Sequence, residues 1–137
     1  MDLLEAYNNS EDKLLHKDLT EKIISCFYQV YNDLGYGFLE RVYQNALYYA
    51  LFDEGLNCEA EKSIKVYHNS RVVGDYRADL LVENRVLLEL KASEELNSAN
   101  EKQLINYLKA TDIEVGLLLN FGKRPQFKRK VFANKNK

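Results

Sequence analysis

Three residues in the middle of the chain combine charge with an otherwise apolar setting. Asp79, Glu89 and Lys91 lie in the stretch Tyr76-Arg-Ala-Asp-Leu-Leu-Val-Glu-Asn-Arg-Val-Leu-Leu-Glu-Leu-Lys91. Burying two carboxylates is costly unless a counter-charge compensates. A divalent cation held by both would compensate, and Lys91 would then face an anion beside the metal. This is the outline of a phosphodiester-cleaving site, whereas a bare Glu-x-Lys on an exposed strand would be an ordinary salt bridge.

The residue types suit metal-assisted hydrolysis. Neighbouring carboxylates repel each other and tend to hold a proton between them, and a divalent cation removes that conflict. Mg²⁺ prefers hard oxygen ligands and keeps several waters, one of which can attack phosphorus, and we expect Mn²⁺ to substitute for it. The main-chain carbonyl of Leu90 is a further candidate ligand. Lys91 would orient or help to deprotonate the water, or offset charge that develops on the phosphate oxygens.

The spacing between Asp79 and Glu89 decides whether the two carboxylates can meet. Successive residues on a strand point to opposite faces of the sheet. A two-residue turn at 83–84 would therefore leave Asp79 and Glu89 on opposite faces. A three-residue loop over 83–85 would instead place them opposite each other on one face. The metal-site hypothesis requires a loop of three or five residues, or a bulge, at this point.

The elements that must position these residues follow from the apolar pattern. We expect helices at about 19–34, 39–54 and 98–110, and strands at about 64–68, 71–82, 86–90 and 115–119, with a last edge strand at 127–132. Asp18 or Thr20 can cap the first helix. The run 86–90 is apolar on both faces, which suits a central strand. The pattern predicts an α/β fold with a mixed central β-sheet flanked by helices, in the order ααβββαβ before the edge strand.

Length and composition are those of one ordinary domain, so we expect residues 1–137 to form a single unit. Hydrophobic residues make up 46% of the chain, which is enough for a core. No apolar run approaches the length of a membrane span, and no signal peptide is expected before the first helix. Cys26 and Cys58 fit no zinc or redox motif, so we expect reduced thiols and a cytoplasmic setting.

Charge is unevenly distributed along the chain. The net charge of −2 argues against a general polyanion binder. However, residues 123–137 contain seven lysines and arginines and no acid, so the rest carries only 12 basic residues against 21 acidic ones. This basic tail could contact phosphates, with Lys123 and Arg124 nearest the folded core. It could equally be a solubilising, frayed terminus.

The motifs together resemble the PD-(D/E)xK nuclease superfamily, whose core is restriction-endonuclease-like. They are Glu40 at the start of the second helix, the Asp79…Glu89-x-Lys91 run, and Gln103-x-x-x-Tyr107 on the third helix. The run Gly37-x-x-Glu40-x-x-Tyr43 resembles the signature of one branch, the small GxxExxY proteins. The segments Tyr76-Arg-Ala-Asp79 and Leu118-Leu-Asn-Phe-Gly122 are also typical of that branch. The resemblance covers about residues 16–132, and its specificity lies in the combination.

The resemblance implies a role for each matching residue. Asp79 and Glu89 would bind the metal and Lys91 would act in catalysis. Glu40 would be an extra acidic residue near the metal, with a share in binding it or in catalysis. The residues implied beside the site, in contact with DNA, are Gln103 and Tyr107, and Tyr43 is a further candidate for substrate contact.

Three functions compete at this point. The first is a Mg²⁺-dependent nuclease acting on nucleic acid, DNA rather than RNA, without a membrane partner. The second is a catalytically silent nuclease-like module that binds nucleic acid or protein; because a small core has little surface for gripping a duplex, a homodimer or a protein partner would be needed. The third is a different enzyme or a structural domain whose Glu-x-Lys is an ion pair, and it predicts no effect of divalent ions on stability.

Overall fold

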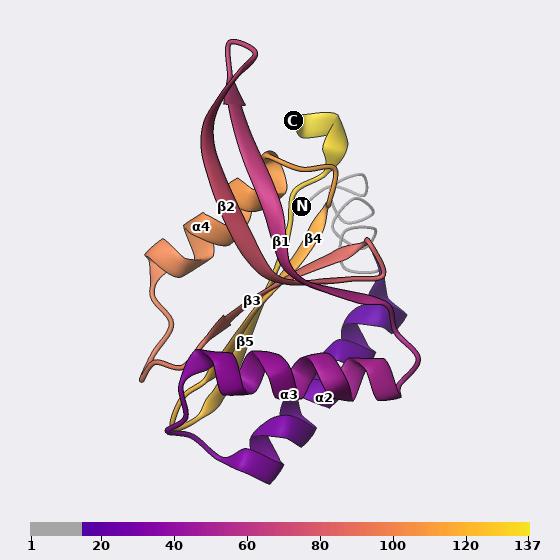
Figure 1. The fold of residues 1–137 in the computed structure, drawn as a ribbon, viewed down its shortest axis with the longest axis vertical. Helices are drawn as coiled ribbons and strands as arrows, with labels where there is room; N and C mark the ends of the chain where they lie inside the picture. The colour runs from indigo at the N-terminus through magenta and orange to yellow at the C-terminus, as the bar shows by residue number, and fades with distance from the viewer. Residues whose placement is uncertain (1–14) are drawn as a thin grey trace, which may run out of the picture.

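The computed structural model describes residues 15–137 (Figure 1). Its helices and strands are, in chain order, α2 (Lys17–Leu34), α3 (Glu40–Asp53), β1 (Cys58–His68), β2 (Arg71–Val82), β3 (Val86–Lys91), α4 (Ser98–Lys109), β4 (Val115–Phe121) and β5 (Pro125–Val131), followed by the short η1 (Asn134–Asn136). The predicted order of elements, including the final edge strand, is confirmed.

The five strands form one mixed sheet in the order β1-β2-β3-β4-β5. β3 and β4 are parallel, whereas the other neighbouring pairs are antiparallel. β3 is the central strand, and Val86 to Leu90 are all buried, as the apolar run predicts. Glu89 is therefore a carboxylate placed in the middle of the sheet.

Helices cover both faces of the sheet, so the molecule has three layers (Figure 1). Leu88 and Leu90 of β3 pack in the core beneath α2 and α3. Leu87 packs on the opposite face with Leu104 and Leu108 of α4. This alternation puts Glu89 on the same face as Leu87, in line with the two-residue period of a strand.

Two boundaries differ from the prediction. β1 begins at Cys58, six residues before the predicted start, because its first half is an edge strand with most side chains in solvent and no apolar alternation. The proposed caps of the first helix are wrong. The N-cap is His16 in a left-handed conformation, and Thr20 lies inside the first turn, where its hydroxyl donates to the Lys17 carbonyl at 3.0 Å.

The basic C-terminal segment is not frayed between 125 and 131. These residues form β5, which pairs along its whole length with β4. Val131 packs against the core under α2 and α3, and Lys130 forms a 2.7 Å ion pair with Glu101 of α4. The solubilising-terminus interpretation is wrong for this strand.

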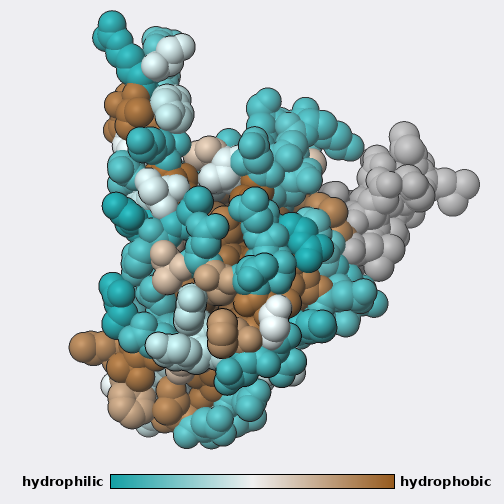
Figure 2. Space-filling view, turned by 45° about the vertical axis from the view of Figure 1, so that its right-hand side comes forward, coloured by the Kyte–Doolittle hydropathy of each residue, from teal (hydrophilic) through white to brown (hydrophobic). Residues whose placement is uncertain are grey.

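β1 and β2 extend as a long hairpin beyond the rest of the sheet (Figure 1). Their register shifts between Val66 and Tyr67, which leaves Val73, next to Gly74, without a cross-strand partner. The end of the hairpin is largely hydrophilic, with a small apolar group below its tip (Figure 2). Separately, none of the helices in residues 15–137 is long and apolar enough to cross a membrane.

Candidate active site

The connection between β2 and β3 has the odd length that the metal-site hypothesis requires. Val82 pairs with Val86, so residues 83–85 form a three-residue loop, and this prediction is confirmed. The loop is closed by a 2.9 Å hydrogen bond from the Arg85 N–H to the Val82 carbonyl. Because the register runs on through paired Leu80 and Leu88, Asp79 and Glu89 lie opposite each other one step further along.

At Asp79 and Glu89, hydrogen bonds between backbone N–H groups and side-chain carboxylates join the two strands. The Asp79 N–H donates to Oε1 of Glu89 at 3.3 Å, and the Leu90 N–H donates to Oδ2 of Asp79 at 2.7 Å. Each carboxylate is thus fixed to the opposite strand through one of its oxygens. The second oxygen of each has no hydrogen-bond partner among residues 15–137. The two strands therefore present a pair of oxygens to a common ligand.

The environment of both carboxylates opposes their ionisation. Burial raises the pKa of Glu89, which is 6% exposed, to about 8, and the charge of Asp79 adds to this effect. Burial also raises the pKa of Asp79. The hydrogen bond from the Leu90 N–H lowers this pKa, whereas the charge of Glu40 raises it. Lys91 lowers both pKa values, yet no lysine or arginine in the described chain lies within ion-pair distance of either carboxylate.

The donor set at Asp79 and Glu89 fits a hard divalent cation. Two facing carboxylates with no ion-pair partner within residues 15–137 form a site that a cation would stabilise. Within residues 15–137 no three His, Cys, Asp or Glu side chains are grouped so as to hold a metal by themselves. Mg²⁺ is commonly bound by one or two carboxylates, with water and substrate phosphates as its other ligands. Two carboxylates are therefore enough protein ligands for this ion.

The start of α3 is fixed to the core by Tyr43. Gly37 has a φ of 110°, which side chains disfavour, and Glu40 is the first residue of the helix. The Tyr43 hydroxyl donates to the Gly35 carbonyl at 2.7 Å, and its ring stacks on Phe121 with centroids 4.3 Å apart. Tyr43 is fully buried, so the prediction that it contacts substrate is wrong. Its place in the motif is to hold the link that precedes Glu40, whose charge raises the pKa of both carboxylates.

Sequence reasoning missed Glu61, which lies between the Ala60–Leu80 and Lys62–Ala78 pairs and whose charge raises the pKa of Asp79. Its φ of 56° is unusual for a side-chain-bearing residue within a strand. One carboxylate oxygen accepts a hydrogen bond from Gln44 at 3.1 Å and pairs with Arg41 at 3.2 Å. Gln44 is buried one helical turn after Glu40, a spacing that could have placed it beside the site. Glu61 itself could not be predicted as a strand residue, because the expected strand began only at residue 64.

The Leu118-Leu-Asn-Phe-Gly122 segment holds the loop that leaves β3. Asn120 is fully buried in β4, and its amide accepts from the Ser93 N–H at 3.0 Å and donates to the Ser93 carbonyl at 2.9 Å. A Cβ on Gly122 would lie 2.2 Å from the same carbonyl, so only glycine allows this approach. Lys91 pairs with Asn120 in the β3–β4 register. The segment therefore sets the path of the chain immediately after Lys91.

Replacing Asn120 with alanine is expected to destabilise the protein by about 2–4 kcal/mol, because a fully buried side chain is truncated and its two hydrogen bonds to the backbone of Ser93 are lost. The measurement is the free energy of unfolding in urea. Asn45→Ala is the matched control, since Asn45 is exposed on α3, and it should change stability by less than about 0.5 kcal/mol. Equal stability of the two variants would contradict this role for Asn120.

α4 brings Tyr107 close to the carboxylates. Burial, followed by the charges of Glu89, Tyr76 and Asp79, raises the pKa of Tyr107 to about 12, so its hydroxyl stays protonated. The ring of Tyr107 lies 5.6 Å from that of Tyr76 on β2. Gln103, one turn earlier, is exposed beside it in a groove that also contains Tyr76. The structure therefore places Tyr107 near the carboxylates, and Gln103 lies beside Tyr107 in the groove.

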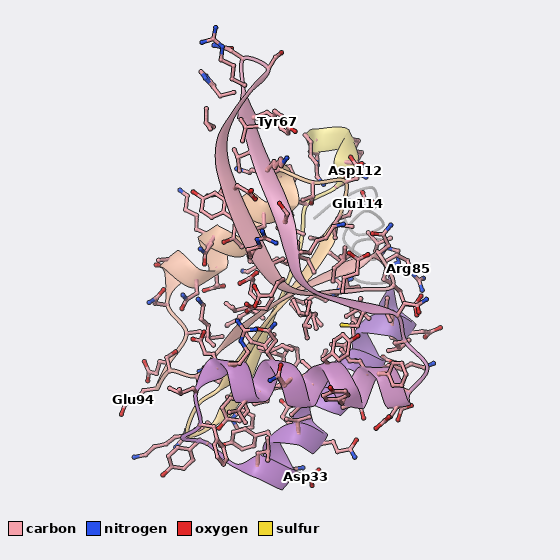
Figure 3. All side chains as sticks on the ribbon, viewed as in Figure 1. Asp33, Tyr67, Arg85, Glu94, Asp112 and Glu114 are labelled. Carbon is pink, nitrogen blue, oxygen red and sulfur yellow. The ribbon has the colours of Figure 1, made fainter. Side chains whose placement is uncertain are left out.

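The remaining predicted residues lie at one end of the sheet. β3 runs from the loop at Arg85 to the loop at Glu94, which lie on opposite sides of the molecule (Figure 3). Lys123 and Arg124 are exposed in the β4–β5 connection, and β4 ends beside Lys91 in the parallel pair. Both side chains thus lie at the end of the sheet to which Lys91 belongs.

Comparisons with known proteins agree with this arrangement. A family model described as the PD-(D/E)XK nuclease superfamily matches residues 17–131. No curated protein matches the sequence. One similar solved structure is titled "Crystal structure of SSO0001", with a TM-score of 0.55 and 21% identity over 86% of this chain, which spans 60% of the length of that one. That likeness concerns the fold, which is restriction-endonuclease-like. By its match over most of its length, the chain belongs to the PD-(D/E)XK nuclease superfamily.

Proposed function

We propose that this protein is a Mg²⁺-dependent nuclease that hydrolyses phosphodiester bonds of DNA, with Mn²⁺ able to replace Mg²⁺. The observation that carries the proposal is the facing pair of half-buried Asp79 and buried Glu89, which have no cationic partner in the described chain and are followed by Lys91 on β3. Membership of a nuclease superfamily whose members generally use divalent metals supports the same conclusion.

Each residue near the carboxylates has a role in this proposal. Asp79 and Glu89 would hold the ion, with the Leu90 carbonyl as a further ligand, and Glu40 would be an additional acidic residue near it. The bound ion supplies Lewis acidity and lowers the pKa of coordinated water. Lys91 places a positive charge where the phosphate oxygens gain negative charge, and it can orient the attacking water. The candidate substrate contacts are Gln103, Tyr107, Lys123 and Arg124, whose amide, hydroxyl and cationic groups suit bases and phosphates.

We further infer that the chain is a single nuclease-like domain over residues 1–137, with its core at about 16–132. Its assignment to the GxxExxY branch rests on Gly37, Glu40 and Tyr43. Gly37 has a positive φ, Glu40 begins α3, and Tyr43 bonds the link before the helix, so each motif position has a structural role. The two free thiols, Cys26 and Cys58, fit the reducing cytoplasmic setting that we propose.

The experiment that tests this function is cleavage of end-labelled single- and double-stranded DNA in Mg²⁺, Mn²⁺ or EDTA. We expect cleavage by the wild type only with a divalent ion. Lys91→Ala should lower the rate by about 10²–10³-fold, because one charge that stabilises the transition state is removed. Lys22→Ala, an exposed lysine on α2, is the matched control and should leave the rate unchanged. Cleavage in EDTA, or full activity in Lys91→Ala, would contradict the proposal.

A second candidate function is that of a silent nuclease-like module acting through a homodimer or a protein partner. The observation in its favour is an exposed apolar surface at the start and along one side of α3. Leu39 is 81% exposed and Tyr49 is 64% exposed; Phe38, next to Leu39 in sequence, and Val42, three residues after it, are also exposed. Apolar side chains gather at the lower end of the molecule in Figure 2. Salt-sensitive DNA binding without metal-dependent turnover would favour this candidate.

A further inference from the structure

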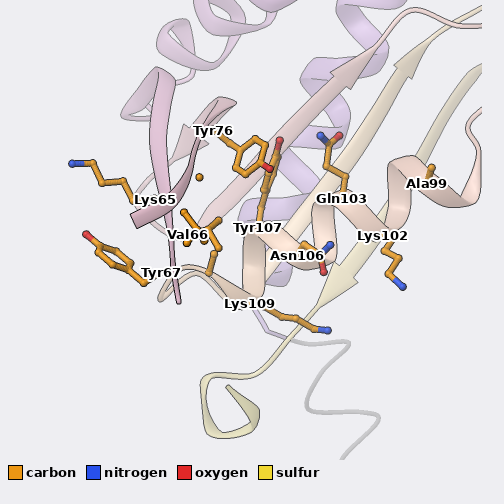
Figure 4. Close-up of a pocket in the computed structure, with 13 residues that line it drawn as sticks. Lys65, Val66, Tyr67, Tyr76, Ala99, Lys102, Gln103, Asn106, Tyr107 and Lys109 are labelled. Carbon is orange, nitrogen blue, oxygen red and sulfur yellow. The ribbon is translucent and has the colours of Figure 1, made fainter. Parts of the chain in front are cut away.

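A groove with a volume of about 760 Å³ separates the β1–β2 hairpin from α4 (Figure 4). Val66 and Tyr76 line it from the hairpin, and Asn106 and Tyr107 line it from the helix. In Figure 4 the rings of Tyr76 and Tyr107 lie next to each other where the hairpin meets α4. The groove is thus an aromatic-lined channel beside the body of the sheet.

The charge of the groove is opposite to that of the whole chain. Its charged lining residues are Lys65, Lys102 and Lys109, and no acidic residue lines it, although the chain carries a net charge of −2. Within residues 15–137 none of these lysines forms an ion pair; Lys109 lies over the ring of Phe132 at 5.4 Å. Lys65 and Lys102 extend from opposite sides of the groove in Figure 4. Both walls can therefore contact an anionic ligand.

Groups suited to nucleobases lie between these lysines. Tyr76 is 48% exposed, so one side of its ring is open to a ligand. A Cβ on Gly74 would lie 3.0 Å from the Tyr76 ring, so glycine at this position leaves room for the ring. The side-chain amides of Gln103 and Asn106 have no hydrogen-bond partner in the described chain and can pair with base edges.

Tyr107 joins the groove to the carboxylate site. Its ring contacts Tyr76 in the groove, and its hydroxyl lies within electrostatic reach of Asp79 and Glu89. A chain of nucleotides lying in the groove would therefore lead to the two carboxylates.

We propose that this groove binds single-stranded nucleic acid, with an unpaired base stacked on Tyr76 and the backbone between Lys65 and Lys102. Aromatic faces combined with flanking lysines are the general means by which proteins hold unpaired strands. A volume of about 760 Å³ is in the range of small-molecule pockets, so a few unpaired nucleotides fit where a duplex does not. The inference rests on the proposed nuclease function only in naming the substrate class, since the groove can be tested without cleavage.

The test is fluorescence anisotropy in EDTA with a labelled single-stranded DNA oligonucleotide, an RNA of the same sequence, and the corresponding blunt DNA duplex. We expect the single strands to bind more tightly than the duplex. Tyr76→Ala should weaken single-strand binding at least about fivefold, whereas Tyr76→Phe should retain it. Lys102→Ala should reduce the slope of log K against log salt concentration by about 0.7. Lys22→Ala, at an exposed position on α2, is the matched control.

The outcomes separate the groove from the catalytic proposal. Single-strand binding that depends on Tyr76 and Lys102 in a protein that never cleaves would support the groove and count against the nuclease. Metal-dependent cleavage by a protein whose single-strand binding is unaffected by Tyr76→Ala and Lys102→Ala would do the reverse. A preference for the duplex, or no oligonucleotide binding at low salt, would overturn the groove proposal. The strand that binds more tightly, DNA or RNA, identifies which nucleic acid the groove prefers.

Discussion

Glu89→Gln is expected to stabilise the metal-free protein at pH 9 by roughly 3–5 kcal/mol. Glutamine has nearly the same shape as glutamate and can still accept the hydrogen bond from the Asp79 N–H. It removes the cost of ionising a carboxylate that is buried opposite another carboxylate. Few single substitutions stabilise a protein this much, because natural cores seldom contain so large an unfavourable term.

The direction of the pH dependence follows from the raised pKa of Glu89. The pKa rises from 4.5 to about 8 on folding, so between these pH values the folded state holds a proton that the unfolded state has released. Stability of the metal-free wild type should therefore fall as pH rises through this window and level off above it. Urea unfolding in EDTA at pH 5, 7 and 9 measures this, and the Glu89→Gln advantage should be at most about 1 kcal/mol at pH 5.

The control for this prediction is Glu94→Gln, which changes an exposed glutamate in the loop after β3. This variant should follow the pH dependence of the wild type. If Glu89→Gln also runs parallel to the wild type from pH 5 to pH 9, the carboxylate of Glu89 does not experience the burial and repulsion described above.

Asp79→Asn should reduce metal-dependent cleavage by about a thousandfold or more without unfolding the protein. Asparagine keeps an oxygen that can accept from the Leu90 N–H, so the strands remain joined. It removes one of the two negative charges that we assign to the metal, and with it the basis for binding a divalent cation. The measurement is the cleavage rate at concentrations of Mg²⁺ and Mn²⁺ that saturate the wild type, with circular dichroism as the check on folding.

Asp75→Asn is the matched control on the same strand. Asp75 is exposed and accepts a hydrogen bond from the Ser63 hydroxyl at 2.7 Å, which asparagine can also accept. Its rate should equal that of the wild type. Cleavage by Asp79→Asn at the wild-type rate would remove Asp79 from the catalytic site.

The strand geometry at the site could be predicted from the sequence because it depends only on the number of residues between Asp79 and Glu89. An odd loop at 83–85 is the condition for Asp79 and Glu89 to face each other, and the period of a strand makes that condition strict. The helical spacing of Gln103 and Tyr107 is equally local, and both line the same groove, with Tyr107 near the carboxylates. The element order was also predictable, since each apolar run is bounded by turn residues.

Contacts between distant segments could not be predicted in this way. The bonds from Asn120 to Ser93 join residues 27 positions apart, and nothing local in either segment indicates them. Glu61 was missed because an exposed edge strand lacks an apolar period. Tyr43 was misassigned because α3 has apolar residues on both its buried and its exposed sides, so the pattern does not tell a core tyrosine from a surface one.

The most direct test of the central claim, that Asp79 and Glu89 form a divalent-metal site, is calorimetric titration of Mg²⁺ and Mn²⁺ at pH 7. Titration of wild type and Asp79→Asn in buffers of different ionisation enthalpy also counts released protons. We predict binding to the wild type with release of up to about one proton, because Glu89 must ionise to bind the ion, and no binding to the variant. Equal binding to both proteins, or none to the wild type even with DNA present, would contradict the account.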